Sequence, residues 1–440
     1  MKLASYPEYK DSGQPFLGDI PVHWNLFRNG RLFSQRNETG FGELPILEVS
    51  LKTGVRIRDM DNLKRKQVMA DREKYKRAAQ GDIAYNMMRM WQGAVGVAPV
   101  DGLVSPAYVV VRPFPEVDCR YFSYLFRTAS YMNEVDAYSR GIVKDRNRLY
   151  WQDFKRMTSP VPPVEEQRHI TRFLDTVGSR VQRFVRNKRR LIELLKEQKQ
   201  NVINQAVTRG LDPKVNFKPS GVEWIGEIPE HWEVRRLKFL ARIRNGQDYK
   251  DVEAESGYPV MGSGGQFAYA SAFMYEGESV LFGRKGTIDK PLYINERFWT
   301  VDTMFYTEVS KHVFAKFLYY SALSFPFDFY STKTALPSMT QQDLGNHPVA
   351  LPPRDEQKLI ILFIQEESQL FDEAISRAQR EIELMREYRT RLISDVVTGQ
   401  VDVRGIEVPD VAEDELLALE EDTADADDVI EDTLDAEVEQ

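Results

Sequence analysis

The chain has 440 residues, which suits two or three globular domains, and 42% of them are hydrophobic, enough to build buried cores. No stretch approaches the roughly 18 uninterrupted apolar residues of a membrane span, and the first residues lack the apolar segment of a signal peptide, so we expect a cytoplasmic protein. Cys119 is the single cysteine, which excludes an internal disulfide and a cysteine-based zinc site and fits a reducing compartment.

A short motif occurs twice along the chain. Residues 12–32 read SGQPFLGDIPVHWNLFRNGRL and residues 220–238 read SGVEWIGEIPEHWEVRRLK, with Gly, Ile-Pro and His-Trp at one spacing and an offset of 208. Such a repeat indicates an internal duplication. Its apolar residues are interpreted as core anchors that fix the entry of the chain into each domain: Ile20, Trp24, Ile228 and Trp232. His23 and His231 are expected to cap or pack beside the tryptophans, and the alternative role of the motif is to dock a partner protein.

The regions that follow the motif predict strands and turns. Four pieces are short, rich in β-branched or aromatic residues, and bounded by Gly or Pro: 81–87, 106–113, 279–286 and 298–309. The two regions do not resemble each other in sequence. We therefore expect two mixed α+β globular domains. The repeated motifs form a frame that is common to both domains, and the region that follows the first motif, which we call the filling, differs between them.

A second repeated motif precedes each long helical segment. VPPVEEQRHITRFLD at 161–175 matches LPPRDEQKLIILFIQ at 351–365, at an offset of 190. Two prolines before an acidic first turn favour a helix start, and Gly210 and Gly399 favour helix stops. Each helix is predicted to run for about 40 residues, or roughly 60 Å.

Apolar residues along both segments alternate steps of three and four, which is typical of a coiled-coil seam. The first seam consists of Ile170, Leu174, Val177, Val181, Phe184, Lys188, Leu191, Leu195, Gln198 and Val202, of which only Lys188 and Gln198 are polar. The second consists of Ile360, Ile364, Phe371, Ala374, Ala378, Ile382, Met385 and Leu392, and is broken at Glu367. Each helix could pack on its own domain. A stripe this long and narrow is better buried by its twin, so we expect the two helices to pair.

The end of the chain is strongly acidic. Sixteen Asp and Glu and no Lys or Arg follow Arg404, so residues 1–404 hold 59 basic and 51 acidic side chains, a net charge of +8. Such a segment cannot bury much apolar surface, and we predict a largely disordered tail with a short helix near AEDELLALE. A solubilising role is favoured over a partner-binding or DNA-mimicking one.

The complete pattern resembles the specificity subunit of type I restriction-modification systems. The motif GEIPEHWEVRRL, a variable domain, PPxxEQ and a long helix, all present twice, carry the resemblance over about residues 6–404. Segments 81–108 and 277–306 are similar to target-recognition domains of that family. The resemblance implies a non-catalytic subunit that holds two methyltransferase subunits, and through them the restriction and translocation subunits, on a bipartite double-stranded DNA target. S-adenosylmethionine and ATP are then expected on the partner subunits, and no cofactor on this chain.

The expected fold class is α+β: two tandem target-recognition domains separated by two long antiparallel coiled-coil helices in a pseudo-twofold repeat. The predicted boundaries are 1–160 and 213–350 for the recognition domains, 161–212 and 351–404 for the helices, and 405–440 for the acidic tail.

The sequence gives no sign of a catalyst. It contains no Asn/Asp-Pro-Pro-Tyr/Phe motif for methylation of a base amino group and no phosphate-binding Gly-x-x-x-x-Gly-Lys-Ser/Thr loop. The five histidines show no metal-ligand spacing, and GSGG at 262–265 is too weak a pattern to indicate a cofactor loop.

Basic and amide side chains near predicted turns are the candidates for DNA contact, because Lys and Arg neutralise phosphates and Arg or Gln can read base edges. In the first domain they are Lys52, Arg56, Arg58, Arg89, Gln92, Arg140, Lys144, Arg146 and Arg148; in the second, Ser263, Gln266, Arg284, Lys285, Thr287, Lys333, Ser338 and Gln341. For any one of them a solvated surface role is as plausible as DNA contact. Trp91 and Trp299 are interpreted as core residues rather than stacking residues.

A mechanism follows from this organisation. Antiparallel pairing of two equal helices relates the domains by a pseudo-twofold axis, so each domain can address one half-site, and the helix pair sets the distance between them. Because the two domains differ in sequence between their repeated motifs, the DNA target is predicted to have two unlike half-sites.

Two alternatives come from other classes of protein. The chain could be a single-chain DNA-modifying enzyme, which a methylation assay on the isolated chain would reveal, or a coiled-coil scaffold that binds only protein. The basic body and Gly-flanked basic loops favour DNA, and salt-dependent DNA binding would decide between them.

Overall fold

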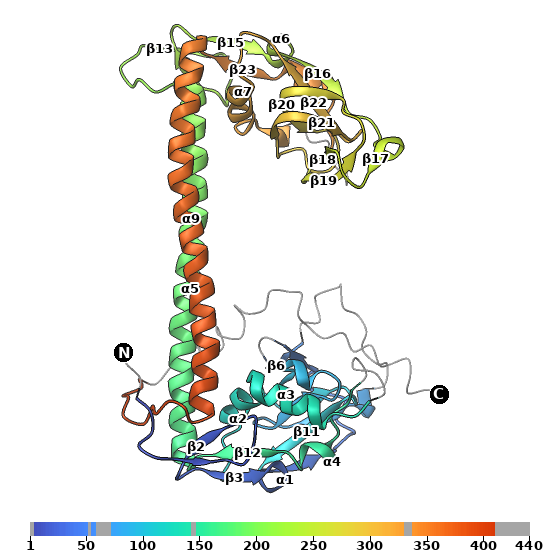
Figure 1. Cartoon of the computed structure of the whole chain (residues 1–440), viewed down its shortest axis with the longest axis vertical. Helices are drawn as coiled ribbons and strands as arrows, with labels where there is room; N and C mark the ends of the chain where they lie inside the picture. Colours follow the sequence, from blue (N-terminus) through green and yellow to red (C-terminus); the bar gives the residue numbers. More distant parts are fainter. Residues whose placement is uncertain (1–3, 52–53, 59–71, 142–146, 330–336, 410–440) are drawn as a thin grey trace. The chain divides into compact units, whose positions relative to one another are not determined.

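Two long helices, α5 (Val164–Arg209) and α9 (Arg354–Val397), organise the chain (Figure 1). The computed structural model describes residues 4–51, 54–58, 72–141, 147–329 and 337–409. The chain divides into unit 1, Met1–Asn187 with Arg380–Gln440, and unit 2, Lys188–Gln379. Because the chain leaves unit 1 within α5 and returns within α9, each unit contains the start of one long helix and the end of the other.

Unit 1 combines short strands with short helices. Its strands are β1 (Tyr9–Asp11), β2 (Asp19–Pro21), β3 (Asn25–Arg28), β4 (Phe33–Arg36), β5 (Leu47–Ser50), β6 (Gly54–Ile57), β7 (Lys76–Ala78), β8 (Ile83–Asn86), β9 (Val95–Val97), β10 (Gly102–Val104), β11 (Tyr108–Pro113) and β12 (Thr158–Val161). Its short helices are α1 (Asn29–Leu32), α2 (Cys119–Phe126), α3 (Ala129–Tyr138) and α4 (Trp151–Phe154), with 3-10 turns η1 (Arg72–Lys74) and η2 (Met90–Gln92). Its central sheet is antiparallel, in the order β4-β11-β8-β9.

Unit 2 has a larger sheet. Its strands are β13 (Phe217–Pro219), β14 (Glu227–Pro229), β15 (Glu233–Arg236), β16 (Ala241–Asn245), β17 (Glu253–Ala254), β18 (Tyr258–Gly262), β19 (Gly265–Ala270), β20 (Tyr275–Gly283), β21 (Leu292–Thr300), β22 (Met304–Val309) and β23 (Pro348–Leu351). Its helices are α6 (Leu237–Leu240), α7 (Ala315–Ala322) and α8 (Gln341–Asn346), with η4 (Lys250–Val252) and η5 (Phe327–Phe329). The sheet order is β16-β22-β20-β21-β18-β19-β17, and the β18–β21 pair is parallel.

The mixed α/β architecture confirms the expected fold class, and most predicted strands are present. The segment 298–309 was predicted as one strand, which is wrong. Its first residues end β21 and its last residues form β22, because Val301 accepts a backbone hydrogen bond from Met304 at 3.0 Å and closes a turn. An apolar run of this length does not show where a chain reverses.

The duplication extends beyond the repeated frame. In unit 1, β3 pairs with β12, and β11 lies between β4 and β8; in unit 2, β15 pairs with β23, and β22 lies between β16 and β20. The two fillings therefore share a strand topology although their sequences do not match. They differ in the additional strands, which in unit 2 widen the sheet to seven members.

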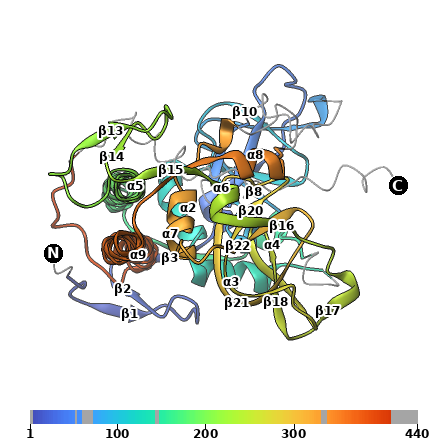
Figure 2. The ribbon, with the colours of Figure 1, turned by 90° about the horizontal axis from the view of Figure 1, so that it is seen from above.

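In each unit the long helices pack together in antiparallel fashion, and they lie side by side in both views (Figures 1 and 2). In unit 1, Ile170 and Leu174 of α5 share a core with Leu392 and Val396 of α9. In unit 2, Lys199 donates to the Asp372 carboxylate at 2.7 Å. The pairing of the helices is thus as predicted.

The predicted seam is confirmed at most positions but shifts in the second half of α5. There Leu191 is 40% exposed, whereas the next residue, Ile192, is only 6% exposed. A helix with 3.6 residues per turn drifts relative to a repeat of 3.5, so a strict alternation of three and four eventually leaves the contact face. The helix ends agree with the prediction: Gly210 and Gly399 have φ angles of +73° and +80°.

The two repeated motifs meet in space. Trp24 is fully buried and donates its indole N–H to Glu166 at 3.0 Å, while His23 lies 2.8 Å from the other carboxylate oxygen. The same contacts recur between Trp232, His231 and Glu356, at 2.9 and 2.6 Å. The tryptophans are therefore core anchors, as predicted.

The glutamine of PPxxEQ fixes a neighbouring loop in each unit. Gln167 donates to Pro162 O at 2.9 Å and accepts from the Asp118 N–H at 2.9 Å. Gln357 repeats both contacts, with Pro352 O at 3.1 Å and the Phe314 N–H at 3.0 Å. The motif thus ties the first turn of each long helix to the globular part of its unit.

The two ends of the described chain meet in unit 1. Asp402 forms an antiparallel bridge with Ala4 and donates its N–H to Ala4 O at 2.8 Å. Ile406 and Val408 also pack against the core of unit 1. Residues 410–440, which hold most of the predicted acidic tail, lie outside the described residues.

Candidate nucleic-acid interface

The second-domain candidates gather around the connection that follows β20. Arg284 donates its backbone N–H to Thr303 O at 2.8 Å and accepts from the Met339 N–H at 3.0 Å, and Lys285 forms an antiparallel bridge with Ser338. Gly286 donates to Pro337 O at 2.9 Å. Three segments distant in sequence, 284–287, 301–303 and 337–341, thus form one surface, which we call the loop cluster.

The side chains of the loop cluster are unequally free to contact a ligand. Lys285 is exposed, and Arg284 is half-buried, with one guanidinium N–H 3.4 Å from Asp302 O and its Cζ 5.9 Å from the centre of the Phe305 ring. Gln341 donates its amide to Ile243 O at 2.9 Å, so it partly braces β16. Arg284 and Lys285 make this surface positively charged, so it is suited to bind phosphate oxygens.

The β18–β19 hairpin lies next to the loop cluster. Its turn consists of Ser263 and Gly264, Gln266 is exposed at the start of β19, and Val301 of the loop cluster donates to Met261 O at 3.2 Å. A Cβ atom added at Gly264, Gly265 or Gly286 would meet nothing within 4 Å. The backbone there is open to close approach by a ligand, as the sequence predicted.

The first-domain candidates form a related but different surface. Leu149 donates its N–H to Met87 O at 2.8 Å, which holds the turn after β8. The hydrogen bond from Met339 to Arg284 O holds the turn after β20 in the same way. On this turn Arg89 is exposed and donates to the Gln92 amide oxygen at 3.1 Å. The two side chains lie together as one donor and acceptor pair.

Arg140 and Arg148 flank a second first-domain loop. They form an antiparallel bridge with mutual backbone hydrogen bonds of 3.0 and 2.9 Å. The Arg140 guanidinium also donates to Asp153 at 2.6 Å, although 67% of its side chain is exposed. The bridge therefore holds Arg140 and Arg148 side by side, next to Leu149, whose N–H contacts Met87 O.

Arg56 and Arg58 are less suited to bind phosphate. Arg56 lies in β6 and Arg58 just after it, and both extend toward Glu48, with N–O distances of 2.8 and 4.0 Å. Their charge is partly neutralised within the protein, so their pairing favours a structural role. The remaining candidates lie outside the described residues: Lys52, Lys144, Arg146 and Lys333.

Two groups near the interface have structural explanations. Trp91 donates its indole N–H to Met88 O at 2.9 Å and Trp299 donates to Gln247 O at 3.0 Å, so both brace the backbone. Both were predicted to be core residues, but they are only half-buried. Arg127 donates to Leu51 O at 2.5 Å, and burial lowers the pKa of Arg127 to about 10, so it stays charged at neutral pH.

Sequence reasoning missed the role of Glu166, Gln167, Glu356 and Gln357. The Glu-Gln pairs were read as part of a helix start, whereas they hold the His-Trp motif and a distant loop. The available signal was that both motifs occur twice, each with the same invariant spacing between its own residues.

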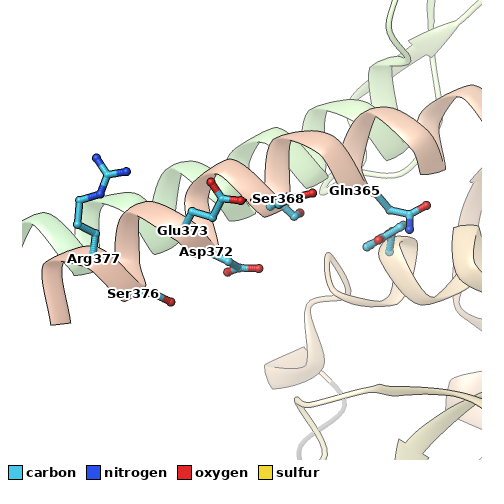
Figure 3. A pocket seen from close by; sticks show the side chains of 8 residues that line it. Gln365, Ser368, Asp372, Glu373, Ser376 and Arg377 are labelled. Atoms are coloured by element: carbon cyan, nitrogen blue, oxygen red, sulfur yellow. Dashed lines mark hydrogen bonds between the residues drawn. The ribbon is translucent and has the colours of Figure 1, made fainter. Parts of the chain in front are cut away.

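A polar hollow of about 700 Å³ runs along α9 in unit 2 (Figure 3). It is open and lined by Tyr320, Gln365, Ser368, Gln369, Asp372, Glu373, Ser376 and Arg377. Its carboxylates disfavour phosphate. Among the described residues no group of three or more His, Cys, Asp or Glu could hold a metal ion, and no helix there is long and apolar enough to cross a membrane.

Comparison with known proteins agrees with this architecture. Residues 229–384 match the family model described as the type I restriction modification DNA specificity domain. The putative type I restriction enzyme MjaX specificity subunit of Methanocaldococcus jannaschii is 24% identical over 429 residues, which cover 88% of this chain and 96% of that subunit. The MjaVIII specificity subunit of the same organism is 25% identical over 288 residues, covering 58% of this chain and 64% of that subunit.

Solved structures show the same fold. A chain from a study of complex assembly and conformational transition of the type I R-M system aligns with a TM-score of 0.66 and 15% identity, covering 86% of this chain and 98% of that one. The HsdS subunit from Thermoanaerobacter tengcongensis aligns with a TM-score of 0.52 and 17% identity, covering 87% and 98%. Together with the sequence matches, these confirm the resemblance to type I specificity subunits.

Proposed function

We propose that the chain is the DNA-recognition subunit of a type I restriction-modification complex and that it binds an asymmetric, bipartite target. The observation that carries the proposal is that the two units have the same frame but carry different side chains on their loops. The Trp24–Glu166 and Trp232–Glu356 contacts are the same in both units, whereas the turns after β8 and β20 carry different side chains. Like frames place the turns equivalently within their units, and unlike turns read different bases.

Each unit would address one half-site through its own loops. In unit 2 the loop cluster offers Arg284 and Lys285 beside the Ser263–Gly264 turn, and in unit 1 the turn after β8 offers Arg89 and Gln92. Arginine can donate two hydrogen bonds to a guanine edge, and glutamine can pair with adenine. The exposed Lys285 suits a phosphate contact that positions the unit without reading sequence.

The long helices would set the distance between the half-sites. At 1.5 Å per residue, the 46 residues of α5 span roughly 69 Å. Half-sites one turn of B-DNA apart are separated by about 34–36 Å, so the helix pair is long enough to hold two readers on one face of the duplex.

The catalytic work would belong to partner subunits. The repeated frame gives two equivalent surfaces, which suits two copies of a methyltransferase subunit, and the restriction subunits would join through them. S-adenosylmethionine and ATP would then bind to those partners, in the cytoplasm. This division is supported by the sequence, which lacks the motifs for base methylation and ATP binding.

Exchange of one reader tests the proposal. Residues 25–160 are replaced by the matching region of another type I specificity subunit, and the chimaera is expressed with the cognate methyltransferase. Sequencing of methylated DNA should show one changed half-site and one preserved half-site. Change in both half-sites, or in neither, would contradict local reading by separate units, and methylation by the isolated chain with S-adenosylmethionine would show an enzyme instead.

A further inference from the structure

Each unit carries two cations on or next to its repeated frame that the proposed reading loops do not include. The first is the arginine before a short helix. Arg28 precedes α1 and Arg236 precedes α6, both with an extended backbone, at φ angles of −67° and −72°. Both arginines are exposed. Their places are equivalent, because Arg28 pairs with Thr158 of β12 as Arg236 pairs with Pro348 of β23.

The second cation is a lysine that comes from a different element in each unit. By the offsets of the two repeated motifs, 208 and 190, Gly30 corresponds to Lys238, and Lys155 corresponds to Gly345. A Cβ atom added at Gly30 would lie 3.2 Å from the Lys155 Cβ. One added at Gly345 would lie 3.6 Å from the Lys238 Cβ. The same contact thus joins one glycine to one lysine in both units, in opposite order.

Packing explains the glycine of this contact but not the lysine. The two segments approach closely, since Asn29 donates its N–H to Met157 O at 2.8 Å and Leu237 donates to His347 O at 2.8 Å. This approach leaves little space beside the larger residue, which favours glycine opposite it. Many polar residues would suit the other position. A lysine in both units, supplied from opposite sides, indicates that a positive charge is required there.

We call the four residues the frame cations: Arg28, Lys155, Arg236 and Lys238. Lys238 donates to the neutral side-chain oxygen of Asn346 at 3.0 Å. Arg235, the neighbour of Arg236, pairs with Glu233 at 2.8 Å, whereas within the described part of the chain no carboxylate pairs with the frame cations. Their charge is therefore available to an anionic partner.

A short helix connects the frame cations to the reading turn of each unit. α4 begins two residues after Leu149, and α8 begins two residues after Met339, the residues that hold the turns after β8 and β20. Figure 2 shows α6 beside α8, whose six residues rise about 9 Å. Three base pairs of B-DNA rise about 10 Å. The frame cations are thus within reach of phosphates a few base pairs from the bases that the turns address.

We propose that the frame cations bind DNA phosphates beside each half-site and so position the reading loops on the duplex, an inference that rests on the DNA recognition proposed above. Phosphates are the same in every sequence, so a phosphate contact suits the repeated frame, whereas base contacts suit the unlike loops. An acidic surface of a methyltransferase subunit is the rival partner. The exposed Phe239 corresponds to Arg31 in unit 1, so the two units share charge here and not an apolar surface.

Neutralisation in the assembled complex tests the contact. Arg236→Gln with Lys238→Gln removes two charges from unit 2. The matched control, Lys214→Gln with Lys358→Gln, removes two exposed charges from other elements of that unit. Each complex is titrated at several salt concentrations with a duplex that carries the methylated target of the wild-type complex, and with single-substituted duplexes.

The frame variant should bind every duplex on the order of 10–100-fold more weakly at about 0.1 M salt, because two phosphate contacts are lost. The slope of log K against log salt concentration should become shallower by about 2, and the control should change little. Binding and a slope like those of the control would overturn the proposal. Relaxation of one base position would assign the cations to base reading instead.

Two further outcomes separate this proposal from its rival and from the proposed function. Loss of methyltransferase subunits from the variant complex without DNA, measured by sedimentation, would show that the frame cations hold the partner protein and would overturn phosphate binding. A wild-type complex that methylates no bipartite target would disprove the proposed function itself. If the wild-type complex does methylate such a target, the titrations test the frame cations alone.

Exchange of the lysine and the glycine in unit 1 separates charge from packing. Lys155→Gly removes one cation and should make the salt slope shallower by about 1. Adding Gly30→Lys returns a lysine to the same contact in the arrangement of unit 2, so affinity and slope should recover. Failure to recover, in a chain that unfolds at the same temperature as the wild type, would contradict the requirement for charge at this place.

Discussion

Trp24 and Glu166 lie 142 residues apart in the sequence and share a buried hydrogen bond of 3.0 Å. Glu166 also accepts from the Tyr6 hydroxyl at 2.7 Å, and its side chain is only 6% exposed. The equivalent Glu356 holds Trp232 in the same way, but 37% of its side chain is exposed. One carboxylate thus joins the entry of the chain to the first turn of a long helix in each unit, with different access to water.

This difference predicts unequal costs for the same substitution. Glu166→Gln should reduce the free energy of unfolding by about 1–3 kcal/mol, because it leaves a buried donor without its charged acceptor. Glu356→Gln should cost less than about 1 kcal/mol, since water can replace the lost contact. The free energy of unfolding of each variant is measured by urea denaturation, with hydrogen exchange as the probe of each unit. Glu165→Gln, on the exposed side of the same turn as Glu166, is the control. Equal losses for the two variants would contradict this account.

The helix stops make a second matched pair. A Cβ at Gly399 would lie 2.4 Å from the Pro21 ring and 3.2 Å from Trp24, whereas one at Gly210 would lie 3.1 Å from Trp232. Both glycines have positive φ, so alanine is strained at either site. Gly399→Ala should cost about 2–4 kcal/mol and Gly210→Ala about 1–2 kcal/mol. Thermal or urea unfolding of the two variants gives the comparison, and a larger loss at Gly210 would be the opposite of the expected order.

A buried histidine makes unit 2 sensitive to acid. His347 is 2% exposed, and burial lowers the pKa of His347 to about 4. Between pH 6.5 and 4 the unfolded chain binds a proton that the folded chain does not, so stability is fully present above pH 6.5 and is lost as pH falls toward 4. The loss should reach about 3 kcal/mol.

The first unit supplies the control for this titration, because Met157 occupies the equivalent buried position 190 residues earlier. His347→Met removes the titrating group and keeps an apolar side chain there. Unfolding free energies measured from pH 7.5 to 4.5 should decline less steeply in the variant. Parallel curves for the two proteins would show that His347 is not responsible.

Arg284 separates base reading from positioning. If its guanidinium reads a guanine, Arg284→Ala should weaken binding of the assembled complex to its target by about 1–3 kcal/mol and relax one base position; if it contacts a phosphate, all sequences should weaken about equally with a shallower salt slope. Titrations against cognate and single-substituted duplexes at several salt concentrations measure this. Lys311→Ala, at the other end of β22 from the loop cluster, is the control and should change little. Unchanged binding at every salt would leave Arg284 as a residue of the turn.

The spacer should follow helix length. Lys199 and Asp372 face each other across the helix pair, so insertion of seven residues beside each adds two turns, or about 10 Å, to both helices. The complex should then recognise the same half-sites with a spacer longer by about three base pairs, as judged by sequencing of methylated DNA. Altered half-site bases with a constant spacer would be incompatible with helices that act as a ruler.

The sequence by itself determined the duplicated frame, the helices and their pairing. These features depend on local patterns: apolar steps of three and four, Pro before a helix start, and Gly at positive φ after its end. Such patterns are set by helix geometry and backbone sterics, which need no knowledge of distant residues. The buried tryptophans followed from the same repeat, because two copies of one apolar motif in unlike surroundings indicate a common packing role.

The tertiary structure alone decided which residues meet. It showed that Glu166 holds Trp24, that Arg56 and Arg58 turn toward Glu48, and that Arg284, Lys285 and Ser338 share one surface. It also showed that two fillings without matching sequences have a common strand topology. Loops carry no periodicity, and a charged side chain can pair with any neighbour of opposite sign. Their partners are therefore fixed by long-range contacts of the folded chain, which a local pattern does not contain.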